Sequence, residues 1–311
     1  NGADPNIATK EEKRTCMIEA VINKNLKIVS TLCNCDRTDI FQGDVNLWTP
    51  VHYASQLDQF VILEAFEDKD FNSLFAETKM KQTPFEISLL WDRNESFSFF
   101  MDKMILEKTD INHQDIYGNT ILHNATRKGN VEKVMDLLNM EKIDPKIQNL
   151  KGQTPLHISI DTWSYEIMEE LALSGECEMN AKDKDGLSPL LLASKIGNSK
   201  IVKFLVQQQS VDCNLTDDKG NTALHYAAML SSSKTMKVLL RSKRFDLSLR
   251  NNDQRTAEEI AIKCRNKECA TAIQLFMKNE LNSETDSDYD SDKNRGRRRH
   301  QRKKIKRSRS Y

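Results

Sequence analysis

A hydroxyl side chain recurs at nearly constant spacing along this chain of 311 residues. Threonine provides it seven times and serine once, and every interval is 34 residues except one of 37. The eight positions are Thr15, Thr49, Thr83, Thr120, Thr154, Ser188, Thr222 and Thr256. A period held this closely predicts one structural unit copied in tandem, in which each copy packs mainly on its neighbours.

The residues next to the repeated hydroxyl indicate the kind of unit. Four copies are 49–54 (Thr-Pro-Val-His-Tyr-Ala), 120–125 (Thr-Ile-Leu-His-Asn-Ala), 154–159 (Thr-Pro-Leu-His-Ile-Ser) and 222–227 (Thr-Ala-Leu-His-Tyr-Ala). These segments resemble the Thr-Pro-Leu-His-x-Ala signature of the ankyrin repeat, and the resemblance covers roughly residues 1–279. The tetratricopeptide repeat has the same period, but its paired small and aromatic positions are missing here. The motif therefore favours the ankyrin family.

Each recurring residue type has a physical role in such a unit. Threonine or serine caps the first helix, and a following proline has its φ preset for the first helical turn. An Asx residue and a glycine, as in Asp115-x-x-Gly118, favour a tight turn between neighbouring units. The resemblance implies an all-α ankyrin-repeat solenoid of helix-turn-helix units joined by β-turn fingers. Its stability comes from stacking, because one unit cannot bury its apolar face alone.

Three parts of the chain are expected. A partial preceding repeat occupies residues 1–14, the ankyrin-repeat array occupies 15–279, and a disordered acidic-then-basic tail occupies 280–311. The first six residues resemble the end of a unit whose helices are absent. We therefore expect the chain to be a fragment of a longer array, with a first unit that frays.

The unit that begins at Thr83 is the most divergent. It has three extra residues, and an aromatic-rich stretch falls where the family has a glycine-containing turn between helices. The aromatic residues are Trp91, Phe97, Phe99 and Phe100. Two interpretations are open: a helix or turn repacked around larger side chains, or a bulge that binds a partner.

The sequence predicts no catalytic residues, no metal site and no cofactor. Packed helices lie about 8–10 Å apart, so His123 and His157 of adjacent units should be too far apart to share a zinc ion, which needs nitrogens at about 2.0–2.1 Å. In the ankyrin family this histidine hydrogen-bonds within the loop network, and the resemblance implies that role for His52, His123, His157 and His225. The seven cysteines have no disulfide-framework spacing, which indicates reduced thiols in a cytosolic or nuclear setting. We expect a protein that is not an enzyme.

The charges divide sharply at the end of the chain. Residues 280–292 include six acidic and no basic residues, whereas 293–311 include eleven basic and no acidic ones. Subtracting these from the 46 basic and 46 acidic residues of the whole chain leaves 35 and 40, so the array has a net charge of about −5. A polar segment of this kind cannot repay the entropy of folding and should be disordered.

The basic part of the tail is dense enough to act as a nuclear-import signal. The residues predicted for an import receptor are Arg297, Arg298, Arg299, Arg302, Lys303, Lys304, Lys306 and Arg307. A solvated tail, or a contact of the tail with nucleic acid or an anionic membrane, is the alternative. Ser283, Ser287 and Ser291 lie among acidic residues and resemble acidic-kinase sites, where phosphate would mask the basic cluster.

Partners of ankyrin arrays are often bound by the finger tips and by the exposed start and end of the first helix. Matching those positions selects Trp48, Gln56, Tyr117, Asn119, Arg127, Lys128, Lys151, Asp161, Lys184, Lys195, Lys219 and Met229. Trp48, Tyr117 and Arg127 are the predicted anchors, because aromatic residues and arginine dominate interface hot spots.

The expected function is a non-enzymatic scaffold or adaptor that binds a protein partner in the cytoplasm or nucleus. No run of 18 or more apolar residues occurs, so no membrane span is predicted. Two alternatives are an ankyrin-array fragment of a larger membrane channel or latrotoxin-like protein, and an enzyme whose catalytic domain precedes Asn1. The identity of the partner is not encoded in a form that the repeat pattern reveals.

Overall fold

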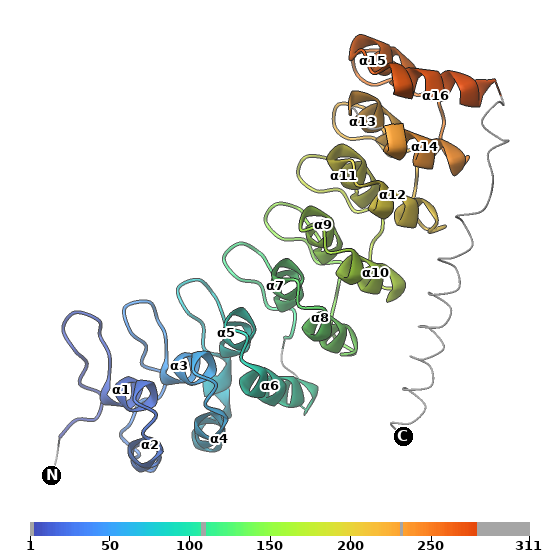
Figure 1. The fold of residues 1–311 in the computed structure, drawn as a ribbon. Coiled ribbons are helices and arrows are strands. Elements are labelled where there is room, and N and C mark those ends of the chain that lie inside the picture. The colour runs from blue at the N-terminus through green and yellow to red at the C-terminus, as the bar shows by residue number, and fades with distance from the viewer. Residues whose placement is uncertain (1–2, 107–109, 231–232, 279–311) are drawn as a thin grey trace, which may run out of the picture.

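The computed structural model describes residues 3–106, 110–230 and 233–278. These residues form eight pairs of antiparallel helices stacked into a curved array, with long loops that project from its concave side (Figure 1). No strand occurs among them. The predicted all-α ankyrin solenoid is therefore confirmed. The predicted import and kinase segments, within 280–311, lie outside the described residues.

The first helices of the pairs lie on the side of the loops, and the second helices lie behind them (Figure 1). The first helices are α1 (Cys16–Ile22), α3 (Pro50–Gln56), α5 (Pro84–Leu90), α7 (Ile121–Lys128), α9 (Pro155–Asp161), α11 (Pro189–Ile196), α13 (Ala223–Met229) and α15 (Ala257–Lys263). The second helices are α2 (Leu26–Cys33), α4 (Phe60–Lys69), α6 (Asn94–Leu106), α8 (Val131–Leu138), α10 (Tyr165–Leu173), α12 (Ser199–Val206), α14 (Ser233–Arg241) and α16 (Lys267–Met277). A short 3₁₀ helix, η1 (Phe71–Phe75), comes directly after α4.

Every first helix begins directly after one of the eight repeated hydroxyl residues, as the spacing predicts. The Thr15 hydroxyl, for example, accepts a hydrogen bond from the Ile18 N–H at 3.3 Å. Proline is the first helical residue of α3, α5, α9 and α11. Such caps matter because helices of seven or eight residues are too short to be stable alone in water.

The apolar core runs along the array and has no single centre. Each first helix packs on the next, from α1 through α15, and each also packs on the second helix of its own pair. Leu122, Leu156 and Leu224 occupy the same position of three repeats and are completely or almost completely buried. Stability therefore comes from contacts between neighbouring repeats.

The divergent third repeat keeps the turn length of the others. The number of residues from Thr83 to the start of α6 is the same as from Thr49 to α4 and from Thr120 to α8. The second helix is lengthened instead, since α6 has 13 residues. Phe97, Phe99 and Phe100 are buried on α6, which supports repacking around larger side chains. Trp91, at the end of α5, remains 48% exposed.

Candidate protein-interaction surface

Four of the first helices are each connected to the next finger along the array by a histidine. His123 Nδ1 accepts a hydrogen bond from the Thr120 N–H at 3.1 Å, and its Nε2 lies 2.9 Å from the Gln153 carbonyl of the next finger. His52, His157 and His225 make the corresponding two contacts, one with the N–H of the threonine that precedes their own helix and one with a carbonyl of the next finger. The predicted structural role of these histidines is confirmed.

The partners of these rings also fix their protonation. A carbonyl oxygen only accepts, so Nε2 must donate and Nδ1 must be the bare nitrogen that accepts from the backbone N–H. Burial lowers the pKa of both His52 and His123 to about 4. It also lowers the pKa of His157 and His225. Because both ring nitrogens are occupied, these histidines have no lone pair left for a metal.

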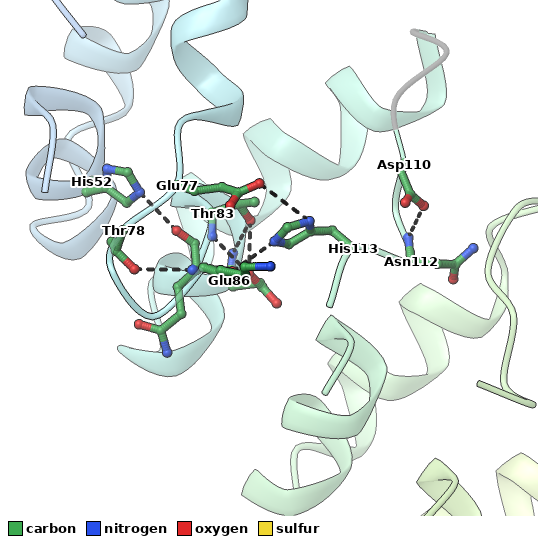
Figure 2. A network of polar contacts seen from close by, with 10 residues as sticks. His52, Glu77, Thr78, Thr83, Glu86, Asp110, Asn112 and His113 are labelled. Carbon is green, nitrogen blue, oxygen red and sulfur yellow. Dashed lines mark hydrogen bonds and ion pairs between the residues drawn. The ribbon is translucent and has the colours of Figure 1, made fainter. Parts of the chain in front are cut away.

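The third repeat replaces this histidine with a glutamate. Glu86 Oε2 accepts a hydrogen bond from the Thr83 N–H at 2.9 Å. Burial raises the pKa of Glu86 to about 8, and nearby Asp115 contributes in the same direction. Figure 2 shows Glu86 beside Thr83, with His113 close to the same loop. His113 Nε2 reaches the Lys81 carbonyl at 2.8 Å, so a ring from the next finger still contacts this loop.

The fingers are rigid turns that bond to one another. Asp115 Oδ1 accepts from the N–H groups of Tyr117 and Asn119 at 2.8 and 2.9 Å, which closes the turn. Gly118 has a φ of 74°, and an added Cβ there would lie 2.8 Å from the Leu150 nitrogen. The Leu150 N–H donates to the Tyr117 carbonyl of the preceding finger at 2.9 Å. The tip side chains are thereby held at regular intervals along the concave side.

The predicted contact residues fall into two rows. The finger row contains Trp48, Tyr117, Asn119, Lys151, Lys184 and Lys219, and the helix-end row contains Gln56, Arg127, Lys128, Asp161, Lys195 and Met229. A side-chain hydrogen bond joins the rows, because Arg127 Nη2 donates to Asn119 Oδ1 at 3.3 Å. The two rows therefore belong to one surface.

Most members of the two rows are solvent-accessible. Tyr117 is 57% exposed and Met229 is also exposed. Trp48 and Gln56 are half-buried, and the Trp48 ring lies 5.3 Å from the ring of Tyr53. The remaining exposed members are Arg127, Lys128, Lys151, Asp161, Lys184, Lys195 and Lys219.

Asn119 does not belong to the accessible surface. It is 4% exposed, and its amide donates to Asp115 Oδ2 while its carbonyl oxygen accepts from Asn149 Nδ2 at 3.0 Å. A side chain at the base of a finger turns inward because it must satisfy the buried finger carboxylate. We therefore correct the prediction for Asn119, which stabilises the fingers from within.

The sequence pattern missed an exposed aromatic residue, Trp163. It lies in the turn between α9 and α10 and is 61% exposed. Its φ is 59°, and the matching positions one repeat before and after are Gly129 and Gly197, with φ of 75° and 81°. A tryptophan in this left-handed position is costly. The glycines 34 residues away on either side were the signal that could have revealed it.

In the part of the chain that the structure describes, no group of three histidine, cysteine or acidic residues is placed to hold a metal ion. Among residues 3–106, 110–230 and 233–278, no helix is both long and apolar enough to cross a membrane.

Comparison with known families identifies the fold class. A model described as "Ankyrin repeats (3 copies)" matches residues 93–183, 164–251 and 190–286. These matches together cover more than half of the chain, which therefore belongs to the ankyrin repeat family. Ankyrin arrays are protein-interaction modules, and the chain is one of them.

Solved structures agree with this assignment. The chain is similar to the ankyrin repeat domain of Bcl-3, described as a unique member of the IkappaB protein family, with a TM-score of 0.65 and 23% sequence identity. The match covers 73% of this chain and 98% of that domain. At this identity the likeness shows the fold alone. A search of curated protein sequences finds no significant match.

Proposed function

We propose that this chain is a non-enzymatic adaptor that binds a protein partner along the concave side of its array and is directed to the nucleus by its basic tail. The observation that supports the first part is the double row of accessible side chains at repeat intervals, held by rigid fingers. Tyr117 is the best anchor because it combines high exposure with a locked finger backbone. Rigid aromatic residues of this kind supply contact area at low entropic cost.

Trp163 is a second proposed anchor. Its left-handed turn conformation disfavours a bulky side chain, and its ring is mostly exposed. Strain at an accessible residue is a feature of binding sites. Its neighbour Asp161 belongs to the helix-end row, so Trp163 would extend that row by one large side chain.

The partner-binding part is tested by affinity capture with the full chain. Tyr117→Ala and Trp48→Ala should each reduce the recovery of the same captured proteins, because truncation of a hot-spot aromatic residue costs about 2 kcal/mol or more. Lys237→Ala is the matched control, since Lys237 is exposed on the second helix α14, away from the fingers. Unchanged capture by both aromatic variants would rule out the proposed anchors.

The nuclear part is tested separately. A fluorescent reporter fused to residues 279–311 should accumulate in the nucleus. Replacing the eight predicted import residues by glutamine should return it to an even distribution. If the reporter is excluded from the nucleus, or if the substitutions do not change its distribution, the basic tail is not the import signal. The two experiments can fail independently of each other.

A further inference from the structure

A cavity of about 690 Å³ lies between the second helices α6 and α8, on the side of the array away from the fingers. Those two helices make few direct contacts, unlike α4 with α6 or α8 with α10. Where α10 and α12 are also loosely packed, the Tyr165 and Phe204 rings meet at 6.0 Å between them. The volume between α6 and α8 is within the range of about 300–1,000 Å³ that is usual for small-molecule sites.

Lys133 lines this cavity and is the exception in a ladder of buried neutral side chains. It is the third residue of α8, and the third residues of the other second helices from α4 onward are Ile62, Ser96, Ile167, Ile201, Thr235 and Cys269. All of these are buried. Lys133 is only 5% exposed, so this repeat buries an ammonium group where the others bury a neutral group.

The Lys133 ammonium is poorly compensated by the protein. It finds no hydrogen-bond acceptor among the described residues. The Asp92 Oδ1 atom lies 4.0 Å away, and the other oxygen of Asp92 is bound by Lys128 at 2.7 Å. The Phe97 ring centre lies 4.9 Å from the ammonium. In the same ladder, by contrast, the Thr235 hydroxyl donates to the Gly197 carbonyl at 3.2 Å.

The buried part of the cavity is apolar, whereas its exposed opening, the mouth, is mostly acidic. Phe97, Met104 and Ile111 line it with buried apolar surface next to Lys133. The exposed carboxylates of Asp102, Glu132, Asp136 and Glu141 surround its opening, with Lys142 among them. Burial raises the pKa of Asp136, and the charge of Glu132 adds to that effect.

We propose that this cavity binds a small molecule with an apolar body, a carboxylate at one end that pairs with Lys133, and a neutral or cationic group at the other end. A buried cation attracts a carboxylate strongly because water does not screen it. The acidic mouth disfavours a second negative charge at the outer end. The inference is independent of the concave surface, because none of the cavity residues belongs to the finger row or the helix-end row.

The test is calorimetric titration of the full chain with straight-chain probes of one length. Decanoate should bind saturably at one site. Decanol, which lacks the carboxylate, should bind about tenfold more weakly or worse, because hydrogen bonds to charged groups are the strong ones. Decanedioate should also bind more weakly than decanoate, and decanoate with a terminal amine at least as well.

The matched pair of variants is Lys133→Met and Lys237→Met. Lys133→Met should reduce decanoate affinity about tenfold or more. It should also raise the Tm by about 2 °C or more, because it removes a buried and poorly paired charge. Lys237→Met removes an exposed lysine of α14, three repeats away from α8 and outside the cavity, and should leave decanoate affinity within about twofold.

Three results would overturn the proposal. They are no saturable binding of decanoate by the wild-type chain, equal affinity for Lys133→Met, or a loss of stability in Lys133→Met that identifies Lys133 as a structural ion-pair partner of Asp92. Decanedioate binding as tightly as decanoate would refute the role of the acidic mouth. Capture of proteins by the concave surface should be the same for Lys133→Met and wild type.

Discussion

Single buried residues at one position of the repeat give this chain two opposite dependences on pH. The histidines of that position have a folded-state pKa below the ordinary value of 6.5, and the neutral form is favoured by folding. Their contribution to stability is complete above about pH 6.5 and is lost as the pH falls through that value toward about 4. Each pKa unit corresponds to about 1.4 kcal/mol, so one such histidine accounts for about 3 kcal/mol.

We therefore expect the free energy of unfolding to fall steeply between pH 6.5 and 4 in urea titrations. His123→Gln should be less stable than wild type at pH 7.5, because it alters the Thr120 and Gln153 contacts, but its stability should fall less over the same range. If His123→Gln lost as much free energy of unfolding between pH 6.5 and 4 as wild type, the lowered pKa of His123 would be contradicted.

Glu86 should act in the other direction. Its folded-state pKa of about 8 lies above the ordinary value of 4.5, so folding favours the protonated form. Its contribution is complete below about pH 4.5 and is lost as the pH rises through about 8. Glu86→Gln keeps an oxygen for the Thr83 N–H without the charge, and its stability advantage over wild type should grow across this range, to about 5 kcal/mol at most.

Glu259 is the matched control for that experiment. It occupies the same position of the last repeat, where it is exposed, and the Thr256 N–H lowers its pKa. Glu259→Gln should therefore gain nothing as the pH rises. Urea titrations of both variants at pH 4.5, 6.5 and 8.5 separate the two cases. If the free energies of unfolding of Glu86→Gln and wild type changed in parallel with pH, the raised pKa of Glu86 would be contradicted.

At the scale of elements, the turn between paired helices combines a structural demand with a proposed binding role. Among the described residues, seven of these turns place a residue in the left-handed region, and five of the seven use a non-glycine residue there: Lys24, Asp58, Asp92, Trp163 and Arg265. Each of these costs about 1 kcal/mol relative to glycine. The conformation persists because stacked repeats on either side fix where both helices begin and end.

Trp163→Gly should accordingly increase stability by about 0.5–1 kcal/mol, the cost of strain less the added entropy of the unfolded chain. It should also weaken partner capture if Trp163 is an anchor. Arg265→Gly, at the same turn position of the last repeat, should increase stability similarly without changing capture. Thermal unfolding and affinity capture of both variants test the two effects. Equal capture by Trp163→Gly and wild type would show that Trp163 has no role in partner binding.

The elements show where sequence reasoning succeeds and where it stops. The spacing of hydroxyl caps predicted the start of every first helix, because capping is a local interaction between residues three apart. The length of α6 was not predicted, because the three extra residues of its repeat could lengthen either a helix or a turn. The inward turn of Asn119 and the cavity beside Lys133 depend on side chains from other repeats. Lys133 did differ from its ladder in sequence, but only the packing reveals that its ammonium lines a cavity.

At the scale of the whole molecule, the division of charge links the array to its tail. The array has a net charge of about −5, and eleven basic residues come after six acidic ones at the end of the chain. Contacts between exposed opposite charges weaken with salt because the Debye length is about 8 Å at physiological ionic strength. The acidic segment is adjacent in sequence to the basic one, so it is the counter-charge that salt screens least.

Phosphorylation of the acidic segment should therefore control the basic segment. Phosphates on Ser283, Ser287 and Ser291 would together add about −5 next to the eleven basic residues. With a reporter fused to residues 279–311, changing the three serines to glutamate should lower the nuclear fraction, whereas changing them to alanine should not. The glutamate variant should also bind an import receptor more weakly at low salt, with a smaller difference at high salt. Identical nuclear fractions for the glutamate and alanine variants would show that the acidic segment does not control nuclear import. The comparison isolates charge, because charge is the property by which the two variants should differ in masking the basic cluster.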